Sequence, residues 1–139
     1  MFYYDLVVSH RFTHRCASIR NINYYHGRPG HTEESTIDTE RDKALRGEPS
    51  EAVERAVKEA IAAIEEDGAE VITFGCSDVF WLQSFLQKRL DEIGWEIPVL
   101  EGYSAAITLA KLFVDLGVDA SGLNFPSDRP KQYRRKKVF

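Results

Sequence analysis

The second half of the chain has a regular pattern of apolar and polar positions, which predicts helices and strands in alternation. After Ser50, a good helix N-cap, apolar side chains recur every three or four residues and acids occupy the first turn. This spacing predicts an amphipathic helix that ends near Asp67 and Gly68. Its apolar stripe consists of Val53, Val57, Ala60, Ile61 and Ile64.

Two short apolar runs and two further helices follow along the chain. Residues 71–74 form a continuous apolar run that predicts a strand buried on both faces, and residues 97–100 predict a second strand. Residues 103–116 predict a helix that Gly117 ends. Residues 79–93 predict another helix, whose inward face holds Phe85, Leu86 and Leu90. Alternating strands and helices with short connections predict an α/β fold, a parallel sheet flanked by helices.

The first half of the chain gives fewer regular signals. Residues 2–11 predict a short helix with Phe2 and Leu6 on one face, and residues 16–23 predict a short strand. Residues 24–49 carry many charges together with glycine and proline, so they predict a long connection. Loops of that length inside compact domains are often functional lids.

Composition restricts the class of protein. The chain has 139 residues, of which 43% are hydrophobic, and this suits one folded domain rather than a disordered segment. No stretch approaches the roughly 20 apolar residues of a membrane span, and the first residues show no secretory signal. The two cysteines form neither a CxxC pair nor a disulfide ladder. We therefore expect a reducing, cytoplasmic location.

Charge is distributed unevenly along the chain. The net charge is −4, but the last eleven residues carry six basic side chains and no acid, which leaves −10 on the first 128 residues. A nucleic-acid binder needs a basic face on its folded part, and an acidic body with a short basic tail does not supply one. We expect an α/β domain over residues 1–122, a solvated basic tail over residues 123–139, and neither nucleic-acid nor membrane partners.

The best candidate for chemistry is Cys76, in the turn that follows the predicted strand 71–74. Ligands of parallel sheets bind outside the carboxyl ends of the strands, which is where this turn lies. The unpaired N–H groups at the start of the next helix favour a thiolate and can hold a carboxylate beside the sulfur. Gly75 permits close approach of the backbone, and the Ser77 hydroxyl adds a donor. A thiolate beside an anion site is what proton abstraction next to a carboxylate requires.

Other interpretations of these residues remain open. A lone cysteine in an apolar segment is usually a small buried hydrophobic residue. The chain contains no G-x-S-x-G motif of serine hydrolases, and His10 and His14 straddle a predicted helix end, so we expect no metal site.

Four segments resemble the aspartate/glutamate/hydantoin racemase superfamily, and hydantoin racemases in particular. Their sequences are RCASIR (15–20), GAEVITFGCSD (68–78), IPVLEG (97–102) and AAITLA (105–110). The resemblance implies a fold of two α/β lobes that face each other across a cleft, and catalysis without a cofactor. Two cysteines, one in each lobe, would remove and return a proton from opposite faces of a small carboxylate or hydantoin-like substrate.

By this resemblance, Cys76 corresponds to the thiol of the second lobe, and Gly75, Ser77 and Asp78 contribute to substrate binding. Asp78 occupies a position where glutamate racemases carry histidine and aspartate racemases carry an acid. The resemblance therefore leaves the identity of the substrate open. The first lobe and the opening strand of the second lobe are absent from this sequence, so we expect an incomplete chain. Cys16 would begin a strand of the same sheet, at the edge opposite Cys76 and about 17–20 Å away. We therefore interpret Cys16 as structural.

Two alternatives to a racemase follow from the single thiol. In the first alternative, the chain is a non-catalytic remnant of such an enzyme. In the second, it is a decarboxylase or isomerase that needs one thiol, as in arylmalonate decarboxylases of the superfamily. The missing opening strand would leave unpaired backbone groups in the sheet, so we also expect the chain to form a homo-oligomer.

Overall fold

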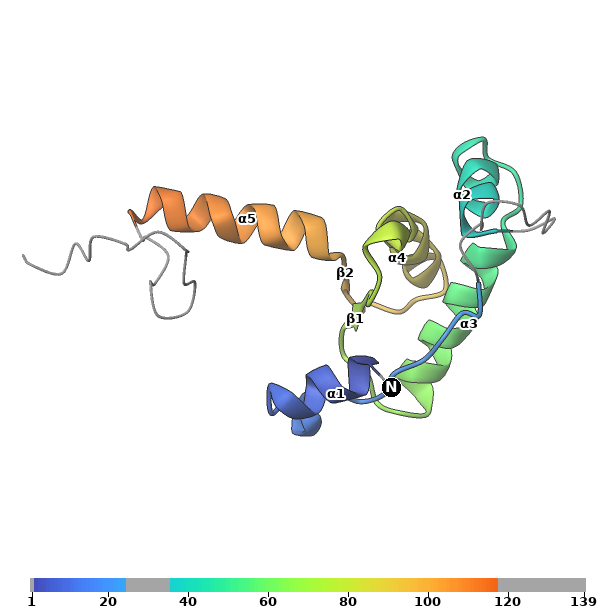
Figure 1. The fold of residues 1–139 in the computed structure, drawn as a ribbon. Coiled ribbons are helices and arrows are strands. Elements are labelled where there is room, and N and C mark those ends of the chain that lie inside the picture. Colours follow the sequence, from blue (N-terminus) through green and yellow to red (C-terminus); the bar gives the residue numbers. More distant parts are fainter. Residues whose placement is uncertain (1, 25–35, 118–139) are drawn as a thin grey trace, which may run out of the picture. The chain divides into compact units, whose positions relative to one another are not determined.

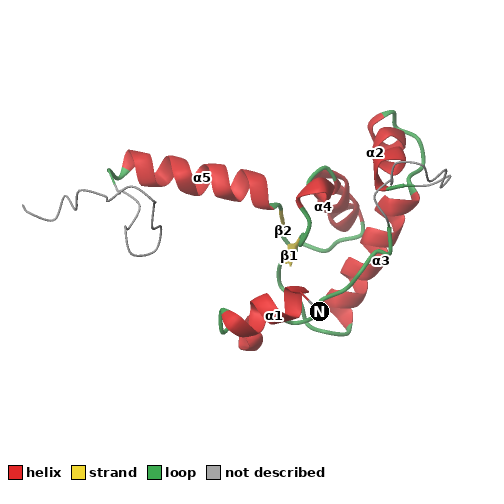
Figure 2. Cartoon of the chain, in the orientation of Figure 1, coloured by secondary structure: helices red, strands yellow, loops and turns green. Residues whose placement is uncertain are grey.

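The computed structural model describes residues 2–24 and 36–117, and the chain divides into two units, Met1–Tyr103 and Ser104–Phe139. The described part is rich in helix and contains one small parallel sheet (Figures 1 and 2). The predicted α/β class with a parallel sheet is therefore confirmed. The predicted basic tail, residues 123–139, lies outside the described residues.

The core of the first unit lies between three helices. The helix α3 (Glu51–Glu65) packs against α2 (Ile37–Leu45) and α4 (Leu82–Glu92). Ser50 caps α3 by accepting a hydrogen bond from the Val53 N–H, as its sequence predicts. The core side chains of α4 are almost fully buried, and they are Leu82, Leu86 and Leu90. Phe85, predicted to face inward with them, is only half-buried and contacts Trp81 edge to face.

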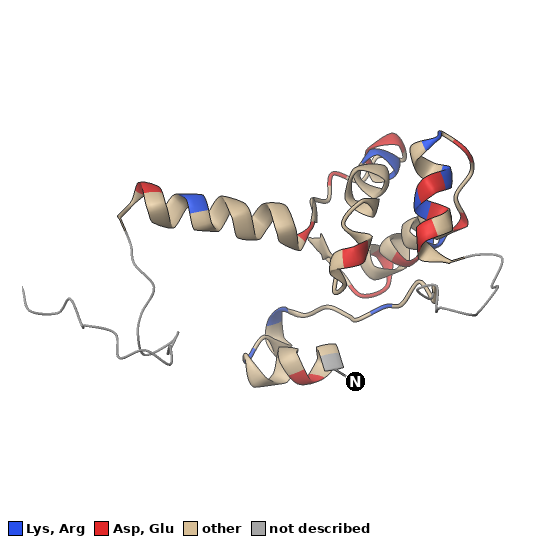
Figure 3. Ribbon diagram, turned by 45° about the horizontal axis from the view of Figure 1, so that its top comes forward, with Lys and Arg blue, Asp and Glu red and all other residues tan. Residues whose placement is uncertain are grey.

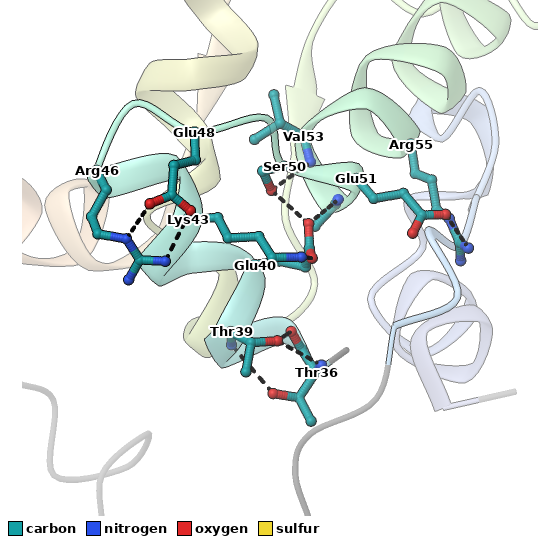
Figure 4. Close-up of polar contacts among 11 residues, drawn as sticks. Thr36, Thr39, Glu40, Lys43, Arg46, Glu48, Ser50, Glu51, Val53 and Arg55 are labelled. Carbon is teal, nitrogen blue, oxygen red and sulfur yellow. Dashed lines mark hydrogen bonds and ion pairs between the residues drawn. The ribbon is translucent and has the colours of Figure 1, made fainter. Parts of the chain in front are cut away.

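The prediction of a long connection over residues 24–49 is wrong where α2 forms. Thr36 and Thr39 make a reciprocal capping box at the start of this helix. The fully buried Glu40 then joins α2 to α3, because its carboxylate accepts from the Ser50 hydroxyl (3.0 Å) and the Ala52 N–H (3.2 Å) (Figure 4). Lys43 lies 2.6 Å from the other carboxylate oxygen. A buried carboxylate needs such partners.

The sheet consists of two short parallel strands, β1 (Ile72–Thr73) and β2 (Val99–Leu100). They pair with Ile72 opposite Val99 and Thr73 opposite Leu100. The strand β1 is shorter than the one predicted over 71–74. The prediction that it is buried on both faces is wrong, since Val71 is 48% exposed and Thr73 is also exposed. The physical reason is that β1 has only one neighbouring strand among the described residues.

Side chains of α4 take the place of a neighbouring strand on the far edge of β2. Gln87 accepts from the Val99 N–H (2.8 Å) and donates to the Ile97 carbonyl (3.1 Å). Gln83 donates to the Val99 carbonyl (3.0 Å). Because backbone groups alternate in direction along a strand, these bonds fall on the side of β2 that faces away from β1.

The segment 16–24 is extended but belongs to no described strand, so the predicted strand over 16–23 is wrong. Charged side chains hold it against α3 instead of backbone pairing. Arg20 contacts Glu66 and Asp67, each at 2.7 Å, and Arg55 donates to the carbonyl of Asn23 (3.2 Å). Hydrogen bonds from Ser18 and Arg20 lower the pKa of Asp67.

The remaining helices lie near the two ends of the described chain. The helix α1 (Phe2–Ser9) confirms the helix predicted over 2–11. The helix α5 (Gly102–Asp115) confirms the one predicted over 103–116, and Gly117 follows it with a φ of 64°. Among residues 2–24 and 36–117, no helix is long and apolar enough to cross a membrane.

We predict that Gln87→Ala destabilises the first unit by about 1–3 kcal/mol, because the substitution leaves the N–H of buried Val99 without its acceptor. The neighbouring change Lys88→Ala is the control, since Lys88 is exposed and its ion pair with Glu92 is long, at 3.8 Å. Denaturant unfolding of the two variants measures the difference. Equal midpoints would contradict the role given to Gln87.

Candidate active site at the carboxyl edge of the sheet

The carboxyl ends of β1 and β2 bring two loops together at one edge of the sheet. The Gly75–Val79 stretch follows β1, and Glu101–Tyr103 follows β2. Phe80, the residue after the first stretch, meets Tyr103 edge to face with ring centroids 5.7 Å apart, so the ends of the two stretches are in contact. This is the edge at which parallel sheets bind ligands.

Cys76 lies at this edge, three residues after the end of β1, as the sequence predicts. Its side chain is half-buried and forms no disulfide. It is the N-cap residue of a short 3₁₀ helix, η2 (Ser77–Val79), and its carbonyl accepts from the Val79 N–H at 3.4 Å. The thiol therefore stands at the start of a tight helical turn.

The predicted helix over 79–93 begins later than expected. The helix α4 starts at Leu82, and η2 with the helical residues Phe80 and Trp81 fills the interval after Cys76. Bonds from Phe80 N to the Ser77 carbonyl and from Gln83 N to the Phe80 carbonyl show the tighter winding. Cys76 thus adjoins a 3₁₀ turn instead of the first turn of the α-helix.

Gly75 lies against the ring of Tyr3, a contact that the sequence does not reveal. A Cβ on Gly75 would lie 2.8 Å from Cζ and 2.9 Å from Cε1 of Tyr3. The Tyr3 hydroxyl donates to the Gly75 carbonyl. A residue of α1 therefore covers the backbone directly before Cys76. Sequence analysis missed Tyr3, because no local pattern links positions 72 residues apart.

The other two predicted site residues, Ser77 and Asp78, lie in η2 and are exposed at the same edge. The Ser77 carbonyl accepts from the Phe80 N–H (3.2 Å), and this bond holds the turn in place. The structure thus brings Gly75, Cys76, Ser77 and Asp78 together, as their adjacency in the sequence requires.

Glu101 is a further carboxylate at this edge, and sequence analysis gave it no role. Its side chain is half-buried and accepts from the Tyr103 N–H (2.7 Å), at the start of α5. Its position in the sequence could have indicated this residue. Glu101 directly follows the predicted strand 97–100, just as Gly75 and Cys76 follow the predicted strand 71–74.

Cys16 occupies a different environment. It lies in the extended segment 16–24, is half-buried, and donates through Sγ to the Ser18 carbonyl (3.6 Å). Cys16 begins no strand of the described sheet, so its predicted place at the edge opposite Cys76 is wrong. Among the residues that the structure describes, no group of three or more His, Cys, Asp or Glu could hold a metal ion.

Comparison with characterised proteins gives three related sequences. The chain is 32% identical over 135 residues to a hydantoin racemase of Pseudomonas sp. (strain NS671). The aligned stretch covers 97% of this chain and 44% of that protein. The chain is a relative of the hydantoin racemases. Two further hydantoin racemases are also similar to the chain. The one from Rhizobium meliloti is 35% identical over 81 residues, and the one from Paenarthrobacter aurescens is 36% identical over 84 residues. These matches cover 58% and 60% of this chain, respectively, and 32% of each relative. This confirms the resemblance to the racemase superfamily. No protein-family model and no solved structure matches the chain.

All three similarities include the Cys76 turn. Any 81 consecutive residues of a 139-residue chain contain residues 59–81, and the two longer matches contain this stretch as well. The chain spans less than half the length of each hydantoin racemase that it matches. The similarity therefore applies to one part of those proteins, and that part includes the Cys76 turn.

A double-mutant cycle tests the contact between Tyr3 and Gly75. We predict that Gly75→Ala destabilises the natural chain, because the new Cβ displaces the Tyr3 ring. In a Tyr3→Ala background the same change should be neutral or stabilising, because the space is empty and φ at Gly75 is not left-handed. Denaturant unfolding measures all four chains, with Tyr4→Ala as the control background. An equal cost of Gly75→Ala in every background would contradict the contact.

Proposed function

We propose that this chain provides the Cys76 thiol for proton transfer at a carbon next to a carbonyl in a hydantoin-like substrate. The observation that carries the proposal is the place of Cys76 at the carboxyl edge of the sheet, within the segment shared with three hydantoin racemases. The reaction would need no cofactor, because a thiolate is itself a sufficient base for such a proton when the resulting charge is stabilised.

The proposed step breaks one C–H bond and forms one S–H bond. The Cys76 thiolate takes the proton, and the electron pair moves into the adjacent carbonyl as an enolate. Donors at the same edge would hold the developing negative charge, among them the hydroxyl and the main-chain N–H of Ser77. Return of the proton from the same thiol restores the starting enantiomer.

Racemisation needs a second proton donor on the opposite face of the substrate carbon. The chain has two cysteines, and Cys16 lies in the segment held against α3 and not in either loop of the candidate site. We therefore assign the second face to a group outside this site. This assignment accords with the greater length of the racemase relatives. We also propose that the protein acts in the cytoplasm, in keeping with its two free cysteines.

A second candidate function is proton exchange or decarboxylation by one thiol. The two described loops of the site contain a single cysteine, and this favours chemistry on one face. A chain with no catalytic activity is the third possibility. The stereochemistry of exchange distinguishes these outcomes.

The test is deuterium exchange of enantiopure 5-substituted hydantoins in D₂O near neutral pH, followed by proton NMR and circular dichroism. We predict that the natural chain exchanges the proton on C5 faster than buffer does. Cys76→Ala should lower this rate by about 10²–10⁴-fold, the usual contribution of one general base. Cys16→Ala is the matched control and should keep the rate.

The pattern of exchange separates the two catalytic functions. Exchange of one enantiomer with retained configuration indicates a single thiol, whereas exchange of both with inversion indicates a second acid on the other face. A folded chain that exchanges neither enantiomer, or a Cys76→Ala variant as fast as the natural chain, contradicts the proposal.

A further inference from the structure

Glu101 lies near Cys76 because the two residues follow neighbouring parallel strands. Thr73 pairs with Leu100, so Glu101 stands one residue and Cys76 three residues beyond this last pair. With strands about 4.8 Å apart and a rise of about 3.3 Å per residue, this register puts their Cα atoms on the order of 8 Å apart. The aromatic contact between the ends of the two stretches keeps them together beyond the strands. A small ring can therefore touch both side chains.

One hydrogen bond fixes the carboxylate of Glu101. Its Oε2 atom accepts from the Tyr103 N–H at 2.7 Å, at the start of α5. This bond holds the carboxylate at the edge of the sheet. A carboxylate has about four lone-pair positions, so capping a helix and accepting from a ligand are compatible. Glu101 is thus an acceptor with a defined position at the candidate site.

The charge of this edge disfavours anionic ligands. The stretches Gly75–Val79 and Glu101–Tyr103 contain the acids Asp78 and Glu101 and no lysine or arginine (Figure 3). A free carboxylate on the substrate would meet like charge here. A hydantoin ring has no carboxylate and carries two N–H donors, on N1 and N3. The edge therefore suits the closed ring better than an open-chain carboxylate.

The reaction proposed for Cys76 distinguishes the two ring N–H groups. It moves negative charge onto the oxygen of C4, which adjoins the reacting carbon C5 on one side. N3 is bonded to C4, whereas N1 is bonded to C5 on its other side. A carboxylate beside C4 would oppose the developing charge, and a carboxylate at the N1–H lies farther from it. N1–H is therefore the donor that fits Glu101.

We propose that Glu101 determines substrate specificity at this site by accepting a hydrogen bond from the N1–H of a hydantoin ring. The inference rests on the function proposed for Cys76, because that function places C5 of the ring at the thiol. Glu101 takes no proton from the substrate. It binds the ring on one side of C5, while Ser77 holds the developing charge on the other.

The test compares the binding of 5-benzylhydantoin with that of its 1-methyl and 3-methyl derivatives, by ligand-observed NMR titration. The variant is Glu101→Gln, whose amide oxygen can still accept from the Tyr103 N–H. Charged acceptors bind about twice as strongly as neutral ones, so Glu101→Gln should raise Kd about five-fold for the parent and the 3-methyl ligand. It should leave Kd unchanged for the 1-methyl ligand, which has no N1–H.

Glu96→Gln is the matched control, since Glu96 is exposed and lies before β2, at the opposite edge of the sheet. It should change none of the three affinities. An equal loss of affinity for all three ligands in Glu101→Gln would overturn the proposal, because it would show a structural role alone. Unchanged binding of the parent ligand, or a natural chain that binds none of the three, would also overturn it.

Binding requires no proton transfer, so this experiment separates the two proposals. Selective loss of N1–H recognition in a chain that exchanges no C5 proton would contradict the function proposed for Cys76 and support the role of Glu101. Exchange at C5 without N1-dependent binding would contradict the role of Glu101 alone.

Discussion

The hydrogen bonds between α4 and β2 are the interaction on which the rest of the candidate site depends. A sheet with two paired residues per strand is too short to be stable by itself, and the backbone groups on its outer edges need partners from elsewhere. Gln87 and Gln83 supply the backbone partners that a third strand would give, and they do so from the helix that carries Leu82, Leu86 and Leu90 into the core. The position of β2, and with it the loop Glu101–Tyr103, is thus fixed by the packing of α4.

The same helix also fixes the turn that holds Cys76. The chain passes from β1 through η2 into α4, so the buried leucines of α4 determine where the thiol lies. Tyr3 of α1 also contacts this turn, at Gly75. Cys76 and Glu101 therefore stand on two loops of one edge, and both are positioned by the core. The chain is similar to a hydantoin racemase over a stretch that contains this edge.

Features that depend on neighbouring residues were predictable, and features that depend on distant side chains were not. Three local features were predicted because each depends on a few consecutive residues. They are the Ser50 cap, the end of α5 at Gly117 and the turn around Cys76. The helix α2 was missed because its buried Glu40 also depends on groups at the start of α3, the Ser50 hydroxyl and the Ala52 N–H, which lie ten and twelve residues further along the chain. The segment 16–24 alternates like a strand, but Arg20 and Arg55 hold it against a helix. Periodicity indicates which face is covered and not what covers it.

The central claim is that Cys76 is the reactive group of a ligand site, and competitive alkylation tests it most directly. The two cysteines are similarly half-buried, so exposure alone does not separate them. Labelling by iodoacetamide near neutral pH, followed by peptide mass spectrometry, measures both rates in one sample. The account predicts that Cys76 reacts faster than Cys16 in the folded chain and that a 5-substituted hydantoin slows Cys76 selectively. Equal rates, or a hydantoin that protects neither thiol, would contradict it.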